Sequence, residues 1–247
     1  MSKKIIAYGN GKTGYLEGDK VIKAFDSDYS KADVLNEALN HARIEETGLN
    51  VPEIKGVEML DGHWVIVKEY IKGRTLAELM EEHPEKEEEY LELFIRTQKL
   101  IHSKRSPELR KQFDRLSDRI AQSSIEATQR FSLLQRMREM PRHKKVCHGD
   151  YNPSNVIVKD NGEVFVIDWS HASQGNAAAD AAQTYLLFLM DGKRELAEKY
   201  IEAFCKTGTT KREYIEKWLP IAAAAQMIRE TGSRKELLAG IANDNKF

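Results

Sequence analysis

The sequence predicts an α+β fold with two lobes: a small N-terminal lobe, built from an antiparallel β-sheet and one helix, and a larger, mainly helical C-terminal lobe. Two observations predict it. Short apolar segments separated by turn residues fill residues 1–72, whereas apolar residues at helical spacing dominate residues 73–247. One β-rich segment, at residues 146–168, interrupts the helical part. We therefore place the boundary between the lobes near Gly73.

The N-terminal lobe is expected to begin with three strands. Apolar and β-branched residues at 5–7, 15–16 and 20–25 are separated by a glycine cluster at 9–14 and by a turn at Gly18-Asp19. This pattern is typical of a β-meander.

A helix and a hairpin are expected next. Between residues 30 and 47 the apolar positions recur at helical spacing, Ser30 can cap the helix start, and Gly48 can end the helix. Residues 52–70 then predict two strands joined at Asp61-Gly62, a favoured hairpin dipeptide. The expected order is three strands, a helix and two strands.

The C-terminal lobe is expected to consist of long helices with one β-hairpin between them. The hairpin falls within residues 146–168, and its turn lies at Asn161-Gly162. The expected helices cover residues 76–82, 84–103, 107–140 with a break near residue 123, a segment that begins near 177, and residues 194–205, 211–229 and 234–242.

Composition excludes several classes of protein. The 247 residues are 41% hydrophobic and 31% charged, as in ordinary globular proteins. The 38 Lys and Arg nearly balance the 39 Asp and Glu, so the net charge gives no argument for nucleic acid or an anionic membrane as partner. No apolar run could span a bilayer, and Cys147 and Cys205 have no metal-binding or redox spacing. We expect a cytoplasmic protein without nucleic-acid or membrane partners; the sequence does not indicate its oligomeric state.

Three oxygen-bearing side chains flank the C-terminal hairpin. Asp150, in a His-Gly-Asp triplet, is followed five residues later by Asn155, and Asp168 comes after the second strand. Carboxylate and amide oxygens are hard ligands that suit Mg²⁺. Phosphoryl transfer depends mainly on positioning and charge neutralisation, so a carboxylate that orients the attacking hydroxyl, beside an Asn/Asp metal pair, is the expected minimum. The spacing supplies this set.

The His-Gly-Asp-x4-Asn segment and the later Ile-Asp-Trp segment resemble the aminoglycoside phosphotransferase and choline kinase family, which has the protein-kinase-like fold. The resemblance covers nearly the whole chain. It implies that Asp150 is the catalytic base and that Asn155 and Asp168 hold Mg²⁺. It also implies that ATP is the phosphate donor, with GTP as a further possibility.

Three glycines near the N-terminus form a G-x-G-x-x-G pattern: Gly9, Gly11 and Gly14. Dinucleotide-binding folds and kinase glycine-rich loops share this pattern. A dinucleotide-binding fold needs a helix directly after the glycines, whereas a strand follows here, so the sequence favours a hairpin over the nucleotide phosphates. A P-loop is excluded because Ile6 occupies the position of its first glycine, and Lys12 is expected to be an exposed loop residue.

Lys23 lies nine residues after Gly14 on the third expected strand, where a kinase places the lysine that contacts the α- and β-phosphates. A single strand lysine is usually solvated. The following helix, however, offers Glu37 as a carboxylate partner, with Glu45 and Glu46 as alternatives. We favour Glu37 because of its early-to-middle place in the helix, as the family pattern suggests.

The resemblance also implies an adenine site. Backbone groups of Glu69 and Ile71, in the segment that joins the lobes, would contact the adenine edge, and Val21, Ile157 and Ile167 would cover its faces. These apolar residues could equally belong to the core.

The remaining polar and aromatic candidates have simpler interpretations. Asp180 matches an aspartate of the family at the start of the helix near residue 177; N-capping is its simplest interpretation, and its role is left open. His102 is expected to be structural. No role is assigned to Tyr151, Trp169 or Trp218.

A small-molecule kinase is the predicted function. A protein kinase needs an activation segment and an A-P-E anchor after its metal-binding aspartate. This sequence leaves little room for an activation segment after Asp168 and has no A-P-E. We therefore expect ATP-dependent transfer of the γ-phosphate to a hydroxyl of an aminoglycoside, a choline-like alcohol, an amino sugar or a related metabolite. One alternative is a catalytically silent pseudokinase or scaffold, and another is a protein that keeps the ATP site but transfers a nucleotidyl group. The sequence leaves the acceptor open.

Overall fold

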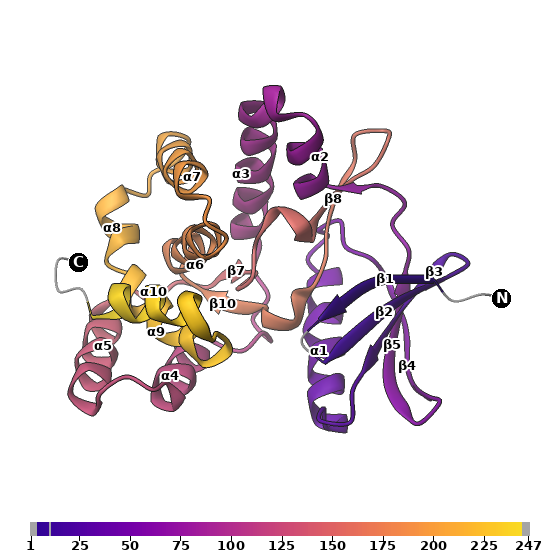
Figure 1. Cartoon of the computed structure of the whole chain (residues 1–247), viewed down its shortest axis with the longest axis horizontal. Helices are drawn as coiled ribbons and strands as arrows, with labels where there is room; N and C mark the ends of the chain where they lie inside the picture. The colour runs from indigo at the N-terminus through magenta and orange to yellow at the C-terminus, as the bar shows by residue number, and fades with distance from the viewer. Residues whose placement is uncertain (1–3, 10, 244–247) are drawn as a thin grey trace. The chain divides into compact units, whose positions relative to one another are not determined.

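The computed structural model describes residues 4–9 and 11–243, and its packing divides the chain into two units (Figure 1). The N-terminal unit comprises Met1–His83 and Pro153–Ala172, and the C-terminal unit comprises Pro84–Asn152 and Ser173–Phe247. This division differs from the expected lobes 1–72 and 73–247, because the segment after Asn152 packs with the N-terminal residues.

A five-stranded antiparallel sheet forms most of the N-terminal unit, with the strand order β1-β2-β3-β5-β4. Its strands are β1 (Lys4–Gly9), β2 (Lys12–Glu17), β3 (Lys20–Phe25), β4 (Ile54–Leu60) and β5 (His63–Glu69). The turn between β4 and β5 has φ of 50° at Asp61 and 81° at Gly62, the left-handed conformation that two-residue hairpin turns favour. The expected meander and hairpin are thus confirmed.

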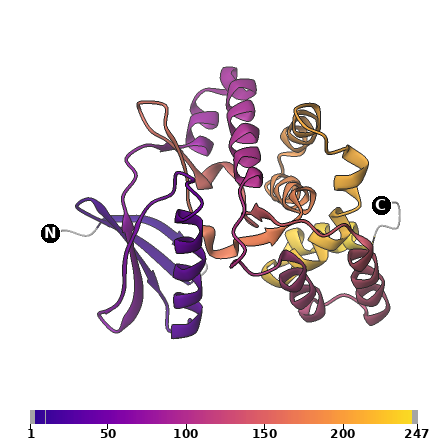
Figure 2. The ribbon, with the colours of Figure 1, turned by 180° about the vertical axis from the view of Figure 1, so that it is seen from behind.

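Helix α1 (Lys31–Glu45) packs on one face of this sheet (Figure 2). Its N-terminus has a capping box, in which Ser30 and Asp33 satisfy each other's backbone N–H. Val34 and Ala38 of the helix join Phe25 and Ile66 of the sheet in a buried cluster. This packing places α1, and with it the buried Glu37, on one side of the sheet.

A second, three-stranded sheet has the order β6-β8-β9 and consists of β6 (Arg74–Thr75), β8 (Val156–Val158) and β9 (Val164–Val166). Strand β6 pairs with β8, and Gly73 permits this approach, since a Cβ there would lie 2.6 Å from the Val158 carbonyl oxygen. The backbone N–H of Val166 also donates to the Asn50 carbonyl. These long-range bonds tie residues 153–172 to the N-terminal unit. Helix α2 (Leu76–Glu82) and the 3₁₀ helices η2 (Pro153–Asn155) and η3 (Trp169–His171) complete it.

Helices dominate the C-terminal unit, around a two-stranded ribbon of β7 (Lys145–Cys147) and β10 (Ser173–Gly175). The helices are η1 (Pro84–Lys86), α3 (Glu87–Ser103), α4 (Gln112–Gln122), α5 (Ala127–Glu139), α6 (Ala177–Met190), α7 (Arg194–Lys206), α8 (Arg212–Glu216), α9 (Leu219–Gln226), η4 (Met227–Arg229) and α10 (Gly232–Ala242). The expected break near residue 123 is confirmed. The expected helix 211–229 is instead divided, because Pro220 lacks an N–H and occupies the first turn of α9.

Aromatic rings fill the centre of the C-terminal unit. Tyr151 is fully buried, stacks on Phe94 with ring centroids 4.3 Å apart, and donates from its hydroxyl to the Phe94 carbonyl. Tyr151 is therefore a packing residue. None of the helices in the described part of the chain combines the length and apolar character that crossing a bilayer requires.

Candidate active site

Lys23 is the centre of a cluster of charged residues in the N-terminal unit. Its Nζ donates to Glu37 Oε1 at 2.6 Å and to Asp168 Oδ1 at 3.1 Å. Burial acts to lower the pKa of Lys23, but the Asp168 and Glu37 carboxylates outweigh it and hold the pKa above its usual value. Strand β3, helix α1 and the segment after β9 thus converge on one ammonium group. Glu37, rather than Glu45 or Glu46, is the partner, as expected.

Asp168 has an unusual backbone conformation. Its φ of 59° and ψ of 63° lie in the left-handed region, which few residues other than glycine adopt, and it immediately precedes η3. Burial acts to raise the pKa of Asp168, but the positive charges of Lys23 and Lys68 outweigh this effect and hold the pKa well below its usual range. The carboxylate is therefore ionised at neutral pH, as a metal ligand must be.

Lys12 contradicts the expectation of an exposed loop lysine. It begins β2, its side chain is only 19% exposed, and its Nζ donates to Glu37 Oε2 at 2.8 Å. The reason is the tight turn: Lys12 pairs with Gly9 on one side and with Phe25 on the other, so its side chain projects on the face that α1 covers. Each carboxylate oxygen of Glu37 therefore holds one lysine.

The glycine pattern forms a hairpin turn, as expected, and no helix follows it. Gly9 ends β1, Asn10 lies outside the described residues, and Gly11 has φ of 67°. Gly14 lies on β2 directly opposite Lys23. The turn and the lysine thus belong to neighbouring strands of one sheet.

Lys68 is the third lysine of this cluster after Lys12 and Lys23, is itself buried, and was not among the residues expected from the sequence. It lies on β5 opposite Val21, and its Nζ is 3.4 Å from His41 Nδ1. Burial and the charge of Lys23 lower the pKa of Lys68 to about 8. The available signal was a lysine at an inward position of an otherwise apolar strand.

The hairpin β8–β9 positions the two residues expected to hold a metal. Asn155 is 9% exposed, and its backbone carbonyl accepts from the N–H of Ile167, the residue before Asp168. One carboxylate and one amide carbonyl form a hard-oxygen donor set, which fits Mg²⁺. The other expected nucleotide-site residues of this unit, Val21, Glu69, Ile157 and Ile167, are half-buried, and Ile71 is buried.

Asp150 belongs to the C-terminal unit, in the loop after β7. Asp180 of α6 organises this loop: its Oδ1 accepts from the Gly149 N–H at 2.8 Å and its Oδ2 from the His148 N–H at 3.3 Å. His102 Nε2 donates to the same Oδ2 at 2.8 Å. Burial acts to raise the pKa of Asp180, but the hydrogen bond and charge of His102, together with His148 and the Gly149 N–H, outweigh it and lower the pKa. A buried carboxylate therefore fixes the backbone that leads into Asp150.

Asp180 is not the N-cap of α6, which was the simplest interpretation of its position. Asn176 caps α6, and its side-chain oxygen accepts from the Ala178 N–H at 2.9 Å. Asp180 lies one turn further on and is fully buried. It therefore anchors the loop instead of terminating the helix.

His102, Cys147 and Asp180 place donor atoms within 4.8 Å of one another, but they do not form a metal site. The Asp180 oxygens already accept three N–H groups. Burial raises the pKa of the Cys147 thiol well above its usual value, so the thiol stays protonated.

The family comparison covers all these charged residues. The model of the phosphotransferase enzyme family matches residues 12–215, which include Lys23, Glu37, Asp150, Asn155 and Asp168. The chain belongs to the phosphotransferase enzyme family. A search of curated protein sequences gives no significant match.

Solved structures of this phosphotransferase fold resemble the chain along nearly its whole length. Aminoglycoside phosphotransferase APH(4)-Ia has a TM-score of 0.70 at 14% identity, covering 98% of this chain and 92% of that one. A choline/ethanolamine kinase family protein from Mesorhizobium loti has a TM-score of 0.67 at 14% identity, covering 100% and 90%. Choline kinase LicA from Streptococcus pneumoniae has a TM-score of 0.65 at 16% identity, covering 99% and 94%. These similarities confirm the expected fold, and the family-model match confirms the expected family.

Proposed function

We propose that this phosphotransferase transfers the γ-phosphate of ATP to a hydroxyl group of a small molecule. The observation that carries the proposal is the position of Lys23 between Glu37 and Asp168. Kinases use a lysine held by a helix glutamate to contact the nucleotide phosphates, beside an aspartate that binds Mg²⁺. Removing such a cluster of charges from water costs free energy, so a purely structural role explains it poorly. Its presence here supports a phosphate ligand.

The residues of the N-terminal unit would bind the nucleotide. Lys23 contacts the phosphates, and the β1–β2 hairpin that carries Gly9, Gly11 and Gly14 lies over them. Asn155 and Asp168 hold Mg²⁺, which neutralises phosphate charge when bound.

The same unit would bind the base. Val21, Ile157 and Ile167 keep part of their apolar surface exposed, which suits the faces of adenine, and backbone groups of Glu69 and Ile71 contact its edge. Guanine remains a possible base in this site.

Asp150 would act on the acceptor. Its carboxylate accepts the proton of the acceptor hydroxyl while the hydroxyl oxygen forms its bond to the γ-phosphorus and the bond from that phosphorus to the leaving ADP oxygen breaks. Asp180 keeps the loop of Asp150 in place through Gly149 and His148.

A thermal-shift experiment tests the nucleotide site. Binding at a hundred times the dissociation constant stabilises a protein by about 2.7 kcal/mol, which raises the melting temperature by roughly 5–10 °C for a chain of this size. We expect this shift with MgATP, and we expect Asp168→Ala to lose it. Asp160→Ala, an exposed residue in the turn of the same hairpin, should keep it.

Measurement of ADP release with a panel of small alcohols then tests transfer. A magnesium-dependent shift with turnover of at least one alcohol supports the proposal. A shift without turnover of any acceptor would favour a silent pseudokinase. No shift with MgATP or MgGTP would overturn the nucleotide site itself. A thermostable mutant of APH(4)-Ia has been crystallised with AMP-PNP and hygromycin B, so aminoglycosides belong in the panel.

A further inference from the structure

We infer that the acceptor of this phosphotransferase is an anionic alcohol, whose carboxylate or phosphate group is bound by Arg115 and Arg119 in the C-terminal unit. This inference rests on the proposed function, because it names the class of molecule that the site phosphorylates. It argues against polycationic acceptors such as aminoglycosides.

The two arginines lie on the inner face of α4. They are four residues apart, so they share one side of the helix, and they are only 7% and 8% exposed. Neighbouring positions Asp114 and Asp118 of the same helix are exposed. Arginine is almost never this buried unless an anion pairs with it.

No carboxylate within residues 4–9 and 11–243 pairs with these guanidinium groups. Among the described residues, neither arginine has a carboxylate within ion-pair distance, and Arg115 Nη2 donates only to the neutral Gln183 Oε1, at 3.5 Å. In the part of the chain that the structure describes, the Nε and Nη1 of Arg115 and the Nη1 of Arg119 are buried and have no hydrogen-bond partner. A buried donor without a hydrogen-bond partner destabilises the folded protein, and more so when it is charged. These N–H groups can therefore donate to the oxygens of a bound ligand.

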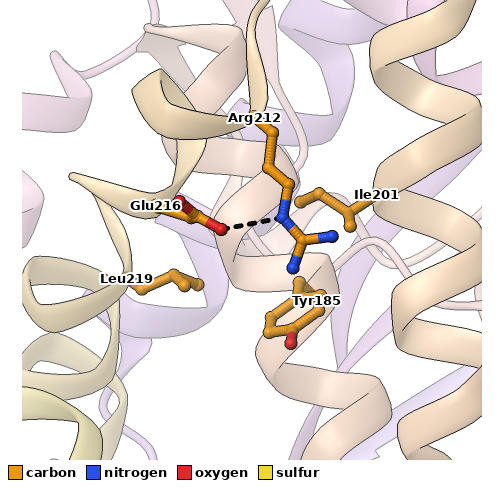
Figure 3. A pocket seen from close by; sticks show the side chains of 5 residues that line it. All are labelled: Tyr185, Ile201, Arg212, Glu216 and Leu219. Atoms are coloured by element: carbon orange, nitrogen blue, oxygen red, sulfur yellow. Dashed lines mark hydrogen bonds and ion pairs between the residues drawn. The ribbon is translucent and has the colours of Figure 1, made fainter. Parts of the chain in front are cut away.

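Arg212, elsewhere in the C-terminal unit, shows what a satisfied arginine looks like here. It lines a small pocket with Tyr185, Ile201, Glu216 and Leu219 (Figure 3). Its guanidinium donates to Glu216 at 2.7 Å and to Glu198 at 2.9 Å. The Glu216 hydrogen bond raises the pKa of Arg212 above its usual value. That pocket is electrically neutralised and offers no charge to an anion.

Arg115 and Arg119 lack the carboxylate partners that Arg212 has, and the positive charges of other arginines act on them. Burial and the charge of Arg229 lower the pKa of Arg115 to about 10. Burial, followed by the charges of Arg115 and Arg229, lowers the pKa of Arg119 to about 8. Guanidinium groups stay protonated at neutral pH, so Arg115 and Arg119 carry positive charge in a buried setting.

A chain of contacts connects the arginines to the proposed base. Asp180 binds the backbone N–H of Gly149, next to Asp150. Gln183 lies three residues after Asp180 on α6, hence on a neighbouring part of the same helix face, and it contacts Arg115. The Asp150 carboxylate also acts on the pKa of both arginines, raising each one. The unpaired positive charge therefore lies close to the group that would receive the acceptor proton.

This arrangement fits one class of acceptor. A carboxylate or phosphate supplies several oxygens to the planar guanidinium fork, and it neutralises the cluster when it binds. A hydroxyl on the same molecule can then approach Asp150. A cationic acceptor would instead meet like charge in a buried setting.

Thermal shifts with matched small alcohols test the inference. The protein is first saturated with MgAMP-PNP, so that the phosphate subsites of the nucleotide are filled. Glycerol, 3-amino-1,2-propanediol, glycerate, glycerol 3-phosphate and inorganic phosphate are then titrated at constant ionic strength. We expect only the anions to raise the melting temperature, by about 4 °C at ten times the dissociation constant. A larger response to glycerate would assign a carboxylate, and a larger response to glycerol 3-phosphate would assign a phosphate.

Arginine variants localise the response. Arg119→Gln and Arg115→Gln should weaken anion binding by about 30-fold or more. Arg119→Lys, which keeps the charge but loses the fork, should weaken it less. Arg110→Gln is the matched control, because Arg110 is exposed and already paired with Asp118. Without ligand, both glutamine variants should melt no lower than the unmodified protein, since they remove unpaired buried charge.

The outcomes separate the two proposals. The inference fails if no anion raises the melting temperature, if glycerol or the amine matches the anions, or if both glutamine variants keep the full anion response. It also fails if both variants melt well below the unmodified protein, because the arginines would then be structural. An anion response without any response to MgAMP-PNP would overturn the proposed kinase function and leave the anion site standing.

Discussion

His41 is a buried histidine that remains neutral in the folded protein. Its Nε2 donates to the Pro52 carbonyl at 2.6 Å, which leaves Nδ1 unprotonated to face Lys68 Nζ at 3.4 Å. Burial and the charge of Lys68 lower the pKa of His41 from 6.5 to about 4. One neutral ring thus links helix α1 to β5 and to the start of β4.

This histidine makes stability depend on pH. The unfolded chain takes up the proton near pH 6.5 and the folded chain only near pH 4, so the stabilisation is complete above pH 6.5 and is lost as the pH falls towards 4. We predict that the free energy of unfolding in urea is about 2 kcal/mol lower at pH 5 than at pH 7. His41→Gln should remove this difference, and His143→Gln, at an exposed position, should keep it. A full difference in His41→Gln would contradict the assignment.

Residue partners were predictable where local signals fixed the geometry. The Ser30 cap set the start of α1, and with it the position at which Glu37 meets Lys23. Lys12 was misplaced because one short turn, which sequence patterns describe poorly, decides the face on which its side chain lies. Arg115 and Arg119 were missed because they interrupt the apolar face of an amphipathic helix, and residue type alone suggested that they were solvated.

At the scale of elements, α4 and β10 lie close together because Gly175 of β10 has no side chain. A Cβ at Gly175 would collide with the Gln112 side chain, approaching its Cδ to 2.7 Å. Gln112 Oε1 also accepts from the Asn176 N–H at 2.8 Å, next to the start of α6. This glycine therefore sets the spacing of the helix that carries Arg115.

Two alanine substitutions should have opposite effects. Gly175→Ala forces α4 away from β10, and overpacking of this kind costs about 1–3 kcal/mol. Gly240→Ala places a methyl group in open space within α10 and should stabilise the protein by about 0.5–1 kcal/mol, because alanine is the better helix former. Calorimetric melting temperatures compare the two. An unchanged or higher melting temperature in Gly175→Ala would show that α4 is not held at this point.

Most elements were predictable because their start and stop signals are local. The Asp61-Gly62 turn and the break after α4 are examples. The pairing of β6 with β8 was not predictable, since it joins residues 74–75 to residues 157–158 across the whole of α3 to α5. Short strands with long-range partners carry no periodic pattern from which the pairing could be read.

For the whole molecule, the two units divide the proposed chemistry. Lys23, Glu37 and Asp168 lie in the N-terminal unit, whereas Asp150 and the arginines of α4 lie in the C-terminal unit. The change in composition near Gly73 predicted two parts. It could not predict that the hairpin with Asp168 joins the first part, because that choice depends on bonds such as the one from Val166 to Asn50.

This division predicts that nucleotide binding and turnover can be separated by mutation. Lys23→Met leaves Glu37 and Asp168 without their shared ammonium group, so it should abolish most of the MgATP-induced thermal shift and turnover together. Asp150→Asn removes only the proton acceptor, so it should keep the shift within about 1 °C while kcat falls by about 10²- to 10⁴-fold. Lys20→Met, an exposed lysine on the same strand as Lys23, is the control and should change neither. Turnover is measured as ADP release with an acceptor found in the alcohol screen. Loss of MgATP binding in Asp150→Asn, or normal kcat in it, would contradict the assignment of Asp150 as the base.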